Sequence, residues 1–371
     1  MKKISVAIDG RPFSGPTNGF TVYLTSVLKT LRAAHFDITL VASKPYKPEH
    51  VIAGEFTTIK LTSKMGRVWW EQWTLLRFLQ KNRYDIYFTG YNTGLPILYL
   101  GKTKLMLGLL DLIPLKFKRL YLFAGLKSSI RSIFSYLIPQ YLSAWKADKI
   151  ITISKASQVD IEHYFPGKEV AYSLIKLEVP GGHPKARKAK RQFVYVGGVD
   201  ARKRIDVVIK AFAQFSQQTP GYKLILIGRG YEVFDPLIAE LGVKDSVVRT
   251  GYISNEEKMS IIADSQAMVY PSLYEGYGLA IAEAFLCNTP VICGTGGSQA
   301  EVGGKGVITI DPTSTNQVAE AMQQVVKHET SKRLEAGMKS QLKLLTSPEI
   351  DRRVAGFFTN LAQGRKEDIE N

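Results

Sequence analysis

The chain has 371 residues, of which 45% are hydrophobic and 22% are charged, and its net charge is +16. This length exceeds one compact core and suits two domains, and the composition excludes a disordered or fibrous protein. The two cysteines, Cys287 and Cys293, exclude a disulfide framework and are typical of a reducing compartment. No apolar window reaches the ~18 residues of a membrane span, and Met1–Asp9 predicts a first strand rather than a signal peptide.

The positive charge is concentrated in the first half of the sequence. Residues 1–182 carry 25 basic and 12 acidic side chains, a balance of +13, whereas residues 193–371 carry 19 and 21, a balance of −2. Residues 183–192 between them hold five basic side chains and no acidic one. A half with this charge favours a partner with distributed negative charge, either nucleic acid or an anionic membrane surface.

Short apolar runs alternate with segments of helical periodicity along the chain. The runs that predict buried strands in the first half are Ile4–Ile8, Ile38–Ala42, Ile86–Thr89, Leu105–Leu110 and Ile150–Ile153. In the second half they are Phe193–Gly197, Leu224–Gly228, Val247–Thr250, Met268–Pro271 and Val291–Cys293. Apolar residues at helical spacing lie between them, as in the series Ile205, Val208, Ile209, Phe212 and Phe215. This alternation predicts parallel sheets with helices on both faces.

The predicted fold class is α/β, with two doubly wound, Rossmann-like domains that face each other across a cleft. The first domain spans residues 1–182, a basic linker covers 183–192, and the second domain spans 193–346. Apolar residues at helical spacing predict a C-terminal helix, residues 349–363, that packs back on the first domain. Ligands of open α/β sheets bind beyond the carboxyl ends of the strands. The loops that follow strands are therefore the candidate site.

Two loops of the second domain carry residues suited to ligand binding. Gly198 lets the backbone approach a ligand, and Arg202 and Lys203 supply charge for a phosphate at the start of a helix. Farther along, Glu275 and Glu283 lie eight residues apart around a glycine-containing turn. Both carboxylates can reach one cleft and accept hydrogen bonds from sugar hydroxyls. The plainer alternative is a cap at Glu275 and a surface residue at Glu283.

These segments resemble the retaining GT-B glycosyltransferases of family 4, the glycosyl transferases of group 1. The family's Glu-x7-Glu donor site is similar to the stretch YPSLYEGYGLAIAEAFLCNTPVICG, and its phosphate loop is similar to FVYVGGVDARKRIDVVIKAF. The segment before the signature resembles GYISNEEKMSIIADSQAMVYPS, and weaker matches in the same order are IDGRPFSGPTNGFTVYL and ITISKASQVDI. The resemblance covers nearly the whole chain and implies the GT-B fold.

The resemblance implies a role for each matching position. Arg202 and Lys203 would neutralise the diphosphate of a nucleotide-sugar. Glu275 would hold the donor sugar and would act with these two cations in catalysis, and Glu283 would bind the ribose hydroxyls. The other donor contacts would come from Gly19 of the first domain and from Gly198, Gly251, Tyr252, Tyr277, Gly278 and Leu279.

The resemblance also implies the reaction and its partners. Family members transfer a hexosyl group with retention, and fixed cations and N–H groups stabilise the leaving diphosphate. We therefore expect no metal and no cofactor beyond the nucleotide-diphosphate sugar. A basic acceptor domain fits an anionic or lipid-linked saccharide at the cytoplasmic face of the inner membrane. This points to synthesis of lipopolysaccharide, capsule or another bacterial surface polysaccharide by a peripheral membrane enzyme.

The first domain departs from the family pattern at Leu110. Family members commonly have a His-Asp pair, where this chain has Leu110 and Asp111. In relatives the histidine contacts the region of the donor's 6-hydroxyl, so a leucine favours a 6-deoxy or pentose donor, because it gains apolar burial against a methyl group. A shifted alignment and a loss of activity are the alternatives. Tyr91 and Asn92 follow a predicted strand and are expected to line the acceptor side with this pair.

Two stretches of the first domain combine basic and apolar residues. Leu112–Ala147 holds six basic residues and no acidic one, and one helical face is traced by Ile130, Ile133, Phe134, Leu137 and Tyr141. This pattern predicts either a membrane-surface helix or a core-facing helix with a solvated basic side. The second stretch follows Gly66 and is expected to lie mainly in the core, because helical spacing joins Trp69, Trp73, Leu76 and Leu79.

Other functions remain open from the sequence. A nucleotide-sugar epimerase of the 2-epimerase type would need acid and base groups near the sugar, and the Glu-x7-Glu context argues against it. Nucleic-acid binding rests on charge without a basic-aromatic motif, so we expect no nucleic-acid partner. The alternatives closest to our prediction are a non-catalytic subunit that stabilises an active transferase and a mannosyl- or glucosyltransferase with a 6-hydroxy donor.

Overall fold

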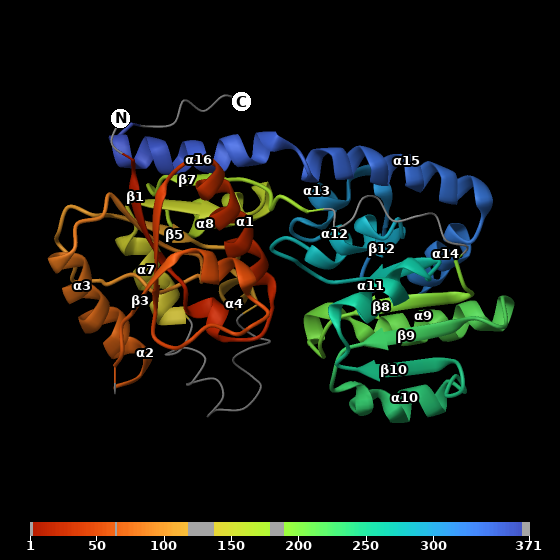
Figure 1. Ribbon diagram of the computed structural model, residues 1–371. Helices are drawn as coiled ribbons and strands as arrows, with labels where there is room; N and C mark the ends of the chain where they lie inside the picture. The colour runs from red at the N-terminus through yellow and green to blue at the C-terminus, as the bar shows by residue number, and fades with distance from the viewer. Residues whose placement is uncertain (1–2, 64, 118–136, 179–188, 366–371) are drawn as a thin grey trace. The chain divides into compact units, whose positions relative to one another are not determined.

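The computed structural model describes residues 3–63, 65–117, 137–178 and 189–365. The chain forms two compact units (Figure 1). Unit 1 comprises Met1–Lys176 and Ser347–Asn371, and unit 2 comprises Leu177–Thr346. The predicted 183–192 linker lies mostly outside the described residues, and the first strand of unit 2 begins at Gln192.

Unit 1 contains a parallel sheet whose seven strands have the order β3-β2-β1-β4-β5-β6-β7. The strands are β1 (Ser5–Asp9), β2 (Asp37–Ala42), β3 (Thr57–Lys60), β4 (Ile86–Thr89), β5 (Lys104–Gly108), β6 (Lys149–Thr152) and β7 (Val170–Tyr172). Adjacent strands pair in register, for example Val6 with Ile38 on one side and with Ile86 on the other. The order reverses between β1 and β4, where open α/β sheets bind ligands at the carboxyl ends.

Helices cover both faces of this sheet (Figure 1). They are α1 (Gly19–Ala33), α2 (Gly66–Trp69), α3 (Leu75–Lys81), α4 (Ile113–Lys116), α7 (Ile138–Lys146), α8 (Lys155–Tyr164) and α16 (Pro348–Gln363). Phe358 of α16 is fully buried, and its ring lies 5.2 Å from that of Phe88 and 6.2 Å from that of Phe36. Tyr87, the neighbour of Phe88, belongs instead to a core cluster with residues of α3, α7 and α8. Successive residues of β4 point to opposite faces of the sheet, so Tyr87 and Phe88 pack against different helix layers.

A π-helical turn, η3 (Trp70–Thr74), separates α2 from α3. The prediction that Trp69 and Trp73 lie mainly in the core is wrong, because their side chains are 42% and 43% exposed. Trp70 is buried in their place, at 2% exposure. The physical reason is that a π turn holds an extra residue, so the buried positions shift relative to ordinary helical spacing between Trp70 and Leu75.

Unit 2 contains a parallel sheet whose six strands have the order β10-β9-β8-β11-β12-β13. The strands are β8 (Gln192–Val196), β9 (Lys223–Ile227), β10 (Val247–Gly251), β11 (Ala267–Tyr270), β12 (Val291–Cys293) and β13 (Val307–Thr309). The helices are α9 (Ile205–Gln218), α10 (Asp235–Glu240), α11 (Asn255–Ala263), α12 (Leu279–Leu286), α13 (Gln299–Gly303), α14 (Thr315–Val325) and α15 (His328–Leu345). Short 3-10 turns are η1 (Arg11–Ser14) and η2 (Val51–Glu55) in unit 1, and η5 (Ala201–Lys203), η6 (Tyr231–Phe234) and η7 (Gly304–Gly306) in unit 2.

The predicted α/β class is confirmed, and each predicted strand has a counterpart in one of the two sheets. The strands that the sequence did not predict are β3, β7 and β13, all at or beside a sheet edge. β3 is mostly exposed, and β7 and β13 have three residues each. Such strands carry too few apolar residues to form a recognisable run.

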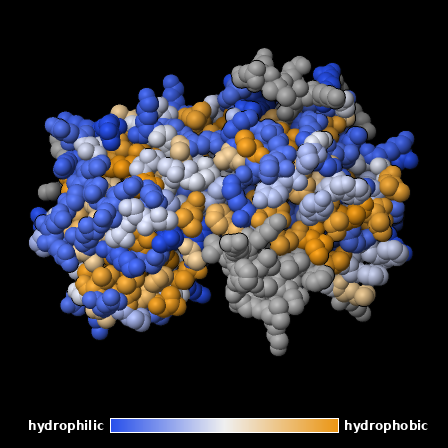
Figure 2. Space-filling view, turned by 180° about the vertical axis from the view of Figure 1, so that it is seen from behind, coloured by the Kyte–Doolittle hydropathy of each residue, from blue (hydrophilic) through white to orange (hydrophobic). Residues whose placement is uncertain are grey.

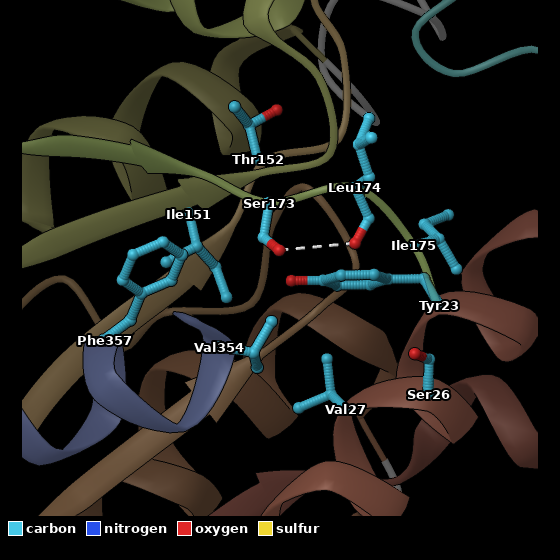
Figure 3. A pocket seen from close by; sticks show the side chains of 10 residues that line it. All are labelled: Tyr23, Ser26, Val27, Ile151, Thr152, Ser173, Leu174, Ile175, Val354 and Phe357. Atoms are coloured by element: carbon cyan, nitrogen blue, oxygen red, sulfur yellow. Dashed lines mark hydrogen bonds between the residues drawn. The ribbon is translucent and has the colours of Figure 1, made fainter. Parts of the chain in front are cut away.

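Unit 1 has a very small cleft between α1, α16 and the residues that follow β7 (Figure 3). The ring of Tyr23 points into it, and most of its other lining atoms are apolar. No lining residue carries a charge. This cleft therefore does not suit a phosphate, and the candidate site lies elsewhere.

Candidate functional site

In unit 2 the strand order reverses between β8 and β11, and the loops after these two strands are joined by hydrogen bonds. Leu273 N–H, after β11, donates to the Arg202 carbonyl, after β8, at 2.8 Å. The strands pair in parallel, with Phe193 beside Ala267. A reversal of this kind opens a crevice at the carboxyl ends of the strands. The two loops predicted from the sequence to bind the donor thus lie side by side.

The β8 loop presents two adjacent basic residues from the turn η5. The Asp200 carboxylate accepts a hydrogen bond from the Arg202 N–H at 2.9 Å and so caps this turn. The backbone after β9 packs closely against this loop, because a Cβ on Gly228 would lie 2.0 Å from the Gly197 carbonyl oxygen. A glycine is therefore required at that position.

The Arg202 side chain turns inward. It is buried, and its Nη1 lies 2.8 Å from Glu275 Oε1 and 3.1 Å from Ser272 Oγ, and also donates to the Tyr274 carbonyl. Burial by itself lowers the pKa of Arg202, but Glu275 and Asp200 outweigh it and hold the pKa above its ordinary value. The guanidinium is therefore permanently charged, and its donors bind the β11 loop.

Glu275 is held through both its carboxylate and its backbone carbonyl. Its Oε1 accepts from Tyr270 Oη at 2.7 Å and from Arg202, and its backbone carbonyl accepts from the N–H and the hydroxyl of Ser298, at 3.0 and 3.1 Å. Burial, and next the negative charge of Glu275, raise the pKa of Tyr270, so this hydroxyl stays a donor. The carboxylate is thereby held at the carboxyl end of β11.

Lys203 extends over the aromatic side of the same site. Its Nζ lies 5.5 Å from the centre of the Tyr270 ring and would be 2.9 Å from a Cβ on Gly197. Unlike Arg202, it has no carboxylate partner in the part of the chain that the structure describes. The half-buried Lys203 ammonium is therefore the basic group of this loop that remains available to an anion.

The helix α12 begins at the other end of the β11 loop. Gly278 is its N-cap at φ +83°, a left-handed conformation that favours glycine, and the first helical residue is Leu279. The first N–H groups of a helix lack intrahelical acceptors, so they suit an anion or sugar oxygens. Tyr277, which precedes the cap, is buried.

The second carboxylate of the signature, Glu283, lies within α12. Its Oε1 is 2.7 Å from Nζ of Lys258 in α11, and both side chains are 20% exposed. Lys258 was not predicted from the sequence. Its position could have indicated a role, because Lys258 follows the Ser254 cap of α11 by four residues and so lies one turn into the helix that precedes the signature. The carboxylate has a cation beside it, and its second oxygen accepts no hydrogen bond from the residues that the structure describes.

The remaining donor positions lie on loops of unit 2 and at one helix start of unit 1. Gly198 is exposed with open space around its Cα, and Tyr252 is 71% exposed beside Gly251, with Arg229 over its ring at 5.2 Å. Gly19 is the exposed first residue of α1, where Asn18 forms a capping box with Thr21. Their predicted contacts with a nucleotide-sugar stay predictions.

In unit 1 the four acceptor-side residues lie at the carboxyl ends of β4 and β5. The side-chain oxygen of Asn92, at φ +59°, accepts from the Leu110 N–H at 2.6 Å. Leu110 is buried, and Asp111 Oδ1 accepts from the Ile113 N–H at 3.1 Å. The Tyr91 ring lies 4.8 Å from that of Phe20 in the first turn of α1. The structure therefore groups these predicted residues next to the start of α1.

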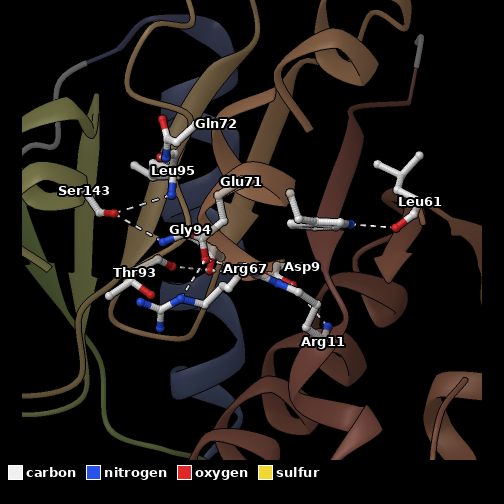
Figure 4. A network of polar contacts seen from close by, with 12 residues as sticks. Asp9, Arg11, Leu61, Arg67, Glu71, Gln72, Thr93, Gly94, Leu95 and Ser143 are labelled. Atoms are coloured by element: carbon white, nitrogen blue, oxygen red, sulfur yellow. Dashed lines mark hydrogen bonds and ion pairs between the residues drawn. The ribbon is translucent and has the colours of Figure 1, made fainter. Parts of the chain in front are cut away.

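A charged network beside this group was not anticipated from the sequence (Figure 4). Arg11 Nη2 lies 2.7 Å from Asp9, and its Nη1 lies 2.9 Å from Glu71 in η3. The two carboxylates are 0% and 3% exposed. Arg11 also lies 4.2 Å from the centre of the Trp70 ring, whose N–H donates to the Leu61 carbonyl at 2.6 Å. The network joins the end of β1 to the π turn.

Part of the chain, mostly within unit 2, is similar in sequence to a known protein family. Residues 183–341 match the model of the family described as Glycosyl transferases group 1. Among curated proteins, O-antigen chain mannosyltransferase B of Escherichia coli is 35% identical over 131 residues, which are 34% of this chain and 34% of that protein. The chain thus matches about a third of this relative's length.

Two solved structures match nearly the whole chain. Sucrose-phosphate synthase from Thermosynechococcus elongatus has a TM-score of 0.76 and 18% identity, and the match covers 98% of this chain and 100% of that one. HepE from Anabaena, in complex with UDP-glucose, has a TM-score of 0.73 and 14% identity, with 96% and 100% covered. The fold is GT-B. In the described residues, no helix is both long and apolar enough to cross a membrane.

Proposed function

We propose that the protein is a retaining glycosyltransferase that moves a sugar from a nucleotide-diphosphate sugar to a saccharide acceptor. The observation that carries this proposal is the junction of the β8 and β11 loops in unit 2. There the Arg202–Glu275 pair and the Lys203 ammonium come together at the strand-order reversal of a GT-B fold. The match of residues 183–341 to the glycosyl transferases of group 1 supports it.

Each group of this site has a task in the proposed reaction. Lys203 and the N–H groups at the start of α12 would neutralise the diphosphate as it leaves, without a metal, because fixed charges and dipoles need no reorganisation. Arg202 would hold Glu275 in place, and Glu275 would bind the donor sugar. Glu283 would accept hydrogen bonds from the ribose, with Lys258 orienting its carboxylate.

The proposed acceptor is an anionic or lipid-linked saccharide at the cytoplasmic face of the membrane. Residues 1–182 carry a balance of +13, which complements a diphosphate or an acidic sugar. The name of the Escherichia coli relative refers to O-antigen chains, which are surface polysaccharide. Much of the 112–147 segment, for which the sequence predicts either a membrane-surface helix or a core-facing helix with a solvated basic side, falls outside the described residues.

The donor sugar is proposed from Leu110. Its apolar side chain at the predicted histidine position favours a 6-deoxy or pentose donor, whereas the mannosyl relative supports a 6-hydroxy donor. Transfer rates with GDP-mannose and its 6-deoxy analogue GDP-rhamnose separate the two. A clear preference for the 6-hydroxy donor would contradict the role given to Leu110.

The proposed activity is tested by nucleotide binding and release. UDP, GDP and TDP are screened for a rise in melting temperature, since a ligand that binds the folded state stabilises it by mass action. The matching nucleotide-sugars are then assayed for nucleotide release with lipid-linked acceptors. Glu283→Ala should weaken donor binding about tenfold or more, a change of about 1.4 kcal/mol. Stabilisation by no nucleotide and release from no donor would favour a non-catalytic partner subunit.

A further inference from the structure

Unit 1 exposes three of the four tryptophans of the chain. Trp69, Trp73 and Trp145 are 42%, 43% and 61% exposed, whereas Trp70 is buried. Tryptophan is rarely left in water without a partner, because its ring buries a large apolar area and its N–H keeps one polar end. Other apolar side chains are also exposed on the molecular surface (Figure 2). All four tryptophans of the sequence, however, belong to unit 1.

The exposed tryptophans lie on one helix layer of unit 1. Gln72 of η3 accepts from the Ile97 N–H at 2.7 Å and donates to the Leu95 carbonyl at 3.0 Å, so the loop after β4 is bound to this helix. Ser143 Oγ of α7 accepts from the Gly94 N–H of the same loop at 3.2 Å. The inner residues of these segments, such as Leu75 and Ala144, share one core cluster on one face of the sheet.

The outer side of this layer is therefore one surface. Its exposed apolar residues are Trp69, Trp73, Leu98, Leu100, Tyr141 and Trp145, and we call it the aromatic surface. Leu98 and Leu100, on the loop, are 75% and 92% exposed.

The segment that carries most of the aromatic surface is rich in basic residues. Residues 65–104 contain six basic and two acidic side chains. The two acidic ones are used inside the unit, because Glu71 is buried beside Arg11 and Asp85 accepts from Ser5 at 2.8 Å. Arg77 lies over the Trp73 ring at 4.1 Å, so a cation borders the aromatic surface directly.

We propose that the aromatic surface docks on an anionic lipid bilayer, with the exposed indoles at the level of the headgroups. Indole rings prefer this depth, and basic side chains around them are attracted to anionic lipids. A second copy of the chain is the poorer occupant, because a twofold contact would place the same basic charges opposite one another. The proposal rests on the proposed function for its purpose, which is to bring unit 1 to a lipid-linked acceptor.

Tryptophan fluorescence tests this docking directly, since every tryptophan of the chain lies on or next to the aromatic surface. Vesicles of phosphatidylglycerol and phosphatidylcholine should shift the emission to shorter wavelength and carry the protein down on sedimentation. Vesicles of phosphatidylcholine alone should do so much less, and high salt should weaken the effect. Lipids brominated near the headgroup should quench the emission of the unmodified protein.

The matched variants are a triple substitution on the aromatic surface and a double substitution in unit 2. Trp69→Ser with Trp73→Ser and Trp145→Ser should weaken sedimentation with the mixed vesicles about tenfold or more, which is about 1.4 kcal/mol. Val233→Ser with Leu344→Ser, at two exposed apolar positions of unit 2, should leave it unchanged. Equal melting temperatures of the variants show that the comparison concerns folded protein.

Three results would overturn the docking proposal. They are unquenched emission with brominated lipid, unchanged vesicle affinity of the triple variant, and a dimer in solution that the triple substitution dissociates. The last would make the aromatic surface a subunit interface. Stabilisation by a nucleoside diphosphate is measured on the same proteins. Vesicle binding without such stabilisation would contradict the proposed function alone, and stabilisation without vesicle binding would contradict the docking alone.

Discussion

Arg202 and Lys203 are neighbours in the chain, yet their positive charges serve different ends. Arg202 is buried and bound to Glu275, Ser272 and the Tyr274 carbonyl, so its donors hold the β11 loop. Lys203 has only the Tyr270 ring and the Gly197 backbone near its Nζ among the contacts described. Loss of Arg202 should therefore affect stability first, and loss of Lys203 should affect ligand binding first.

The first prediction at this scale concerns Lys203. Lys203→Ala should weaken binding of the preferred nucleoside diphosphate about tenfold or more, equal to about 1.4 kcal/mol, and should slow turnover without lowering the melting temperature. Lys210→Ala removes an exposed cation from α9 of the same unit and should change neither. Calorimetric titration measures both variants. Donor affinity equal to that of the unmodified protein in Lys203→Ala would remove this residue from the site.

The second prediction concerns Arg202. Arg202→Met should destabilise unit 2 by about 3 kcal/mol, because it leaves the Glu275 carboxylate buried without its cation. Arg204→Met is the control, since its pair with Asp206 has side chains 26% and 38% exposed and should contribute about 0.5 kcal/mol. Urea unfolding gives both free energies. Equal losses in the two variants would show that the Arg202–Glu275 pair is not what stabilises the loop.

At the scale of elements, the π turn η3 connects the core of unit 1 to its surface. It brings Trp70 and Glu71 into the interior, where Glu71 meets Arg11, and it leaves Trp69 and Trp73 outside. A prediction from periodicity assumes one helical repeat across a segment, but one inserted residue rotates the positions after it by about 100° relative to those before it. This is why Leu76 and Leu79 are buried as predicted, whereas Trp69 and Trp73 are not.

The network at this turn gives a third prediction. Burial alone lowers the pKa of Arg11, but Asp9 and Glu71 hold it above its ordinary value, so the guanidinium stays charged. Arg11→Met should destabilise unit 1 by about 3 kcal/mol or more, because two buried carboxylates lose their cation. Arg67→Met is the control, since Arg67 is half-exposed and 3.8 Å from the same Glu71. Urea unfolding that gives equal losses for both would assign the effect to helix packing instead.

At the scale of the whole molecule, both units bury tyrosine hydroxyls. Burial raises the pKa of Tyr23 and Tyr87 in unit 1, and of Tyr195 and Tyr231 in unit 2; it raises that of Tyr46 to about 12. An unfolded tyrosine loses its proton near pH ~10. Above that pH the folded state binds more protons than the unfolded state, so the free energy of unfolding falls as pH rises.

The fourth prediction is therefore an alkaline loss of stability. Melting temperature should stay level up to about pH 9 and fall above about pH 10. Tyr195→Phe should make this fall shallower, because the Tyr195 hydroxyl is buried and has no hydrogen-bond partner within the described residues. Tyr252→Phe, at a tyrosine whose side chain is 71% exposed, serves as the comparison. An unchanged slope in Tyr195→Phe would show that other groups cause the alkaline transition.

Most of the fold could be predicted from the sequence, because long apolar strands and periodic helices are local patterns. The positions of the candidate site's loops could be predicted as well, since glycines and charges follow strands in a set order. Ion pairs between residues far apart in the sequence could not be predicted. Glu275 with Arg202, Glu283 with Lys258, and Glu71 with Arg11 join residues 25 to 73 positions apart, and only folding brings them together.

The route of the chain has a consequence for biosynthesis. Unit 1 begins at the N-terminus but is completed by α16, after all of unit 2. Until Phe358 emerges from the ribosome, Phe36 and Phe88 of unit 1 lack the ring that covers them. Unit 2 has by then been synthesised entirely, so it can fold first. We therefore expect the nascent first half to expose an apolar face until α16 has been synthesised, a state that favours chaperone binding during translation.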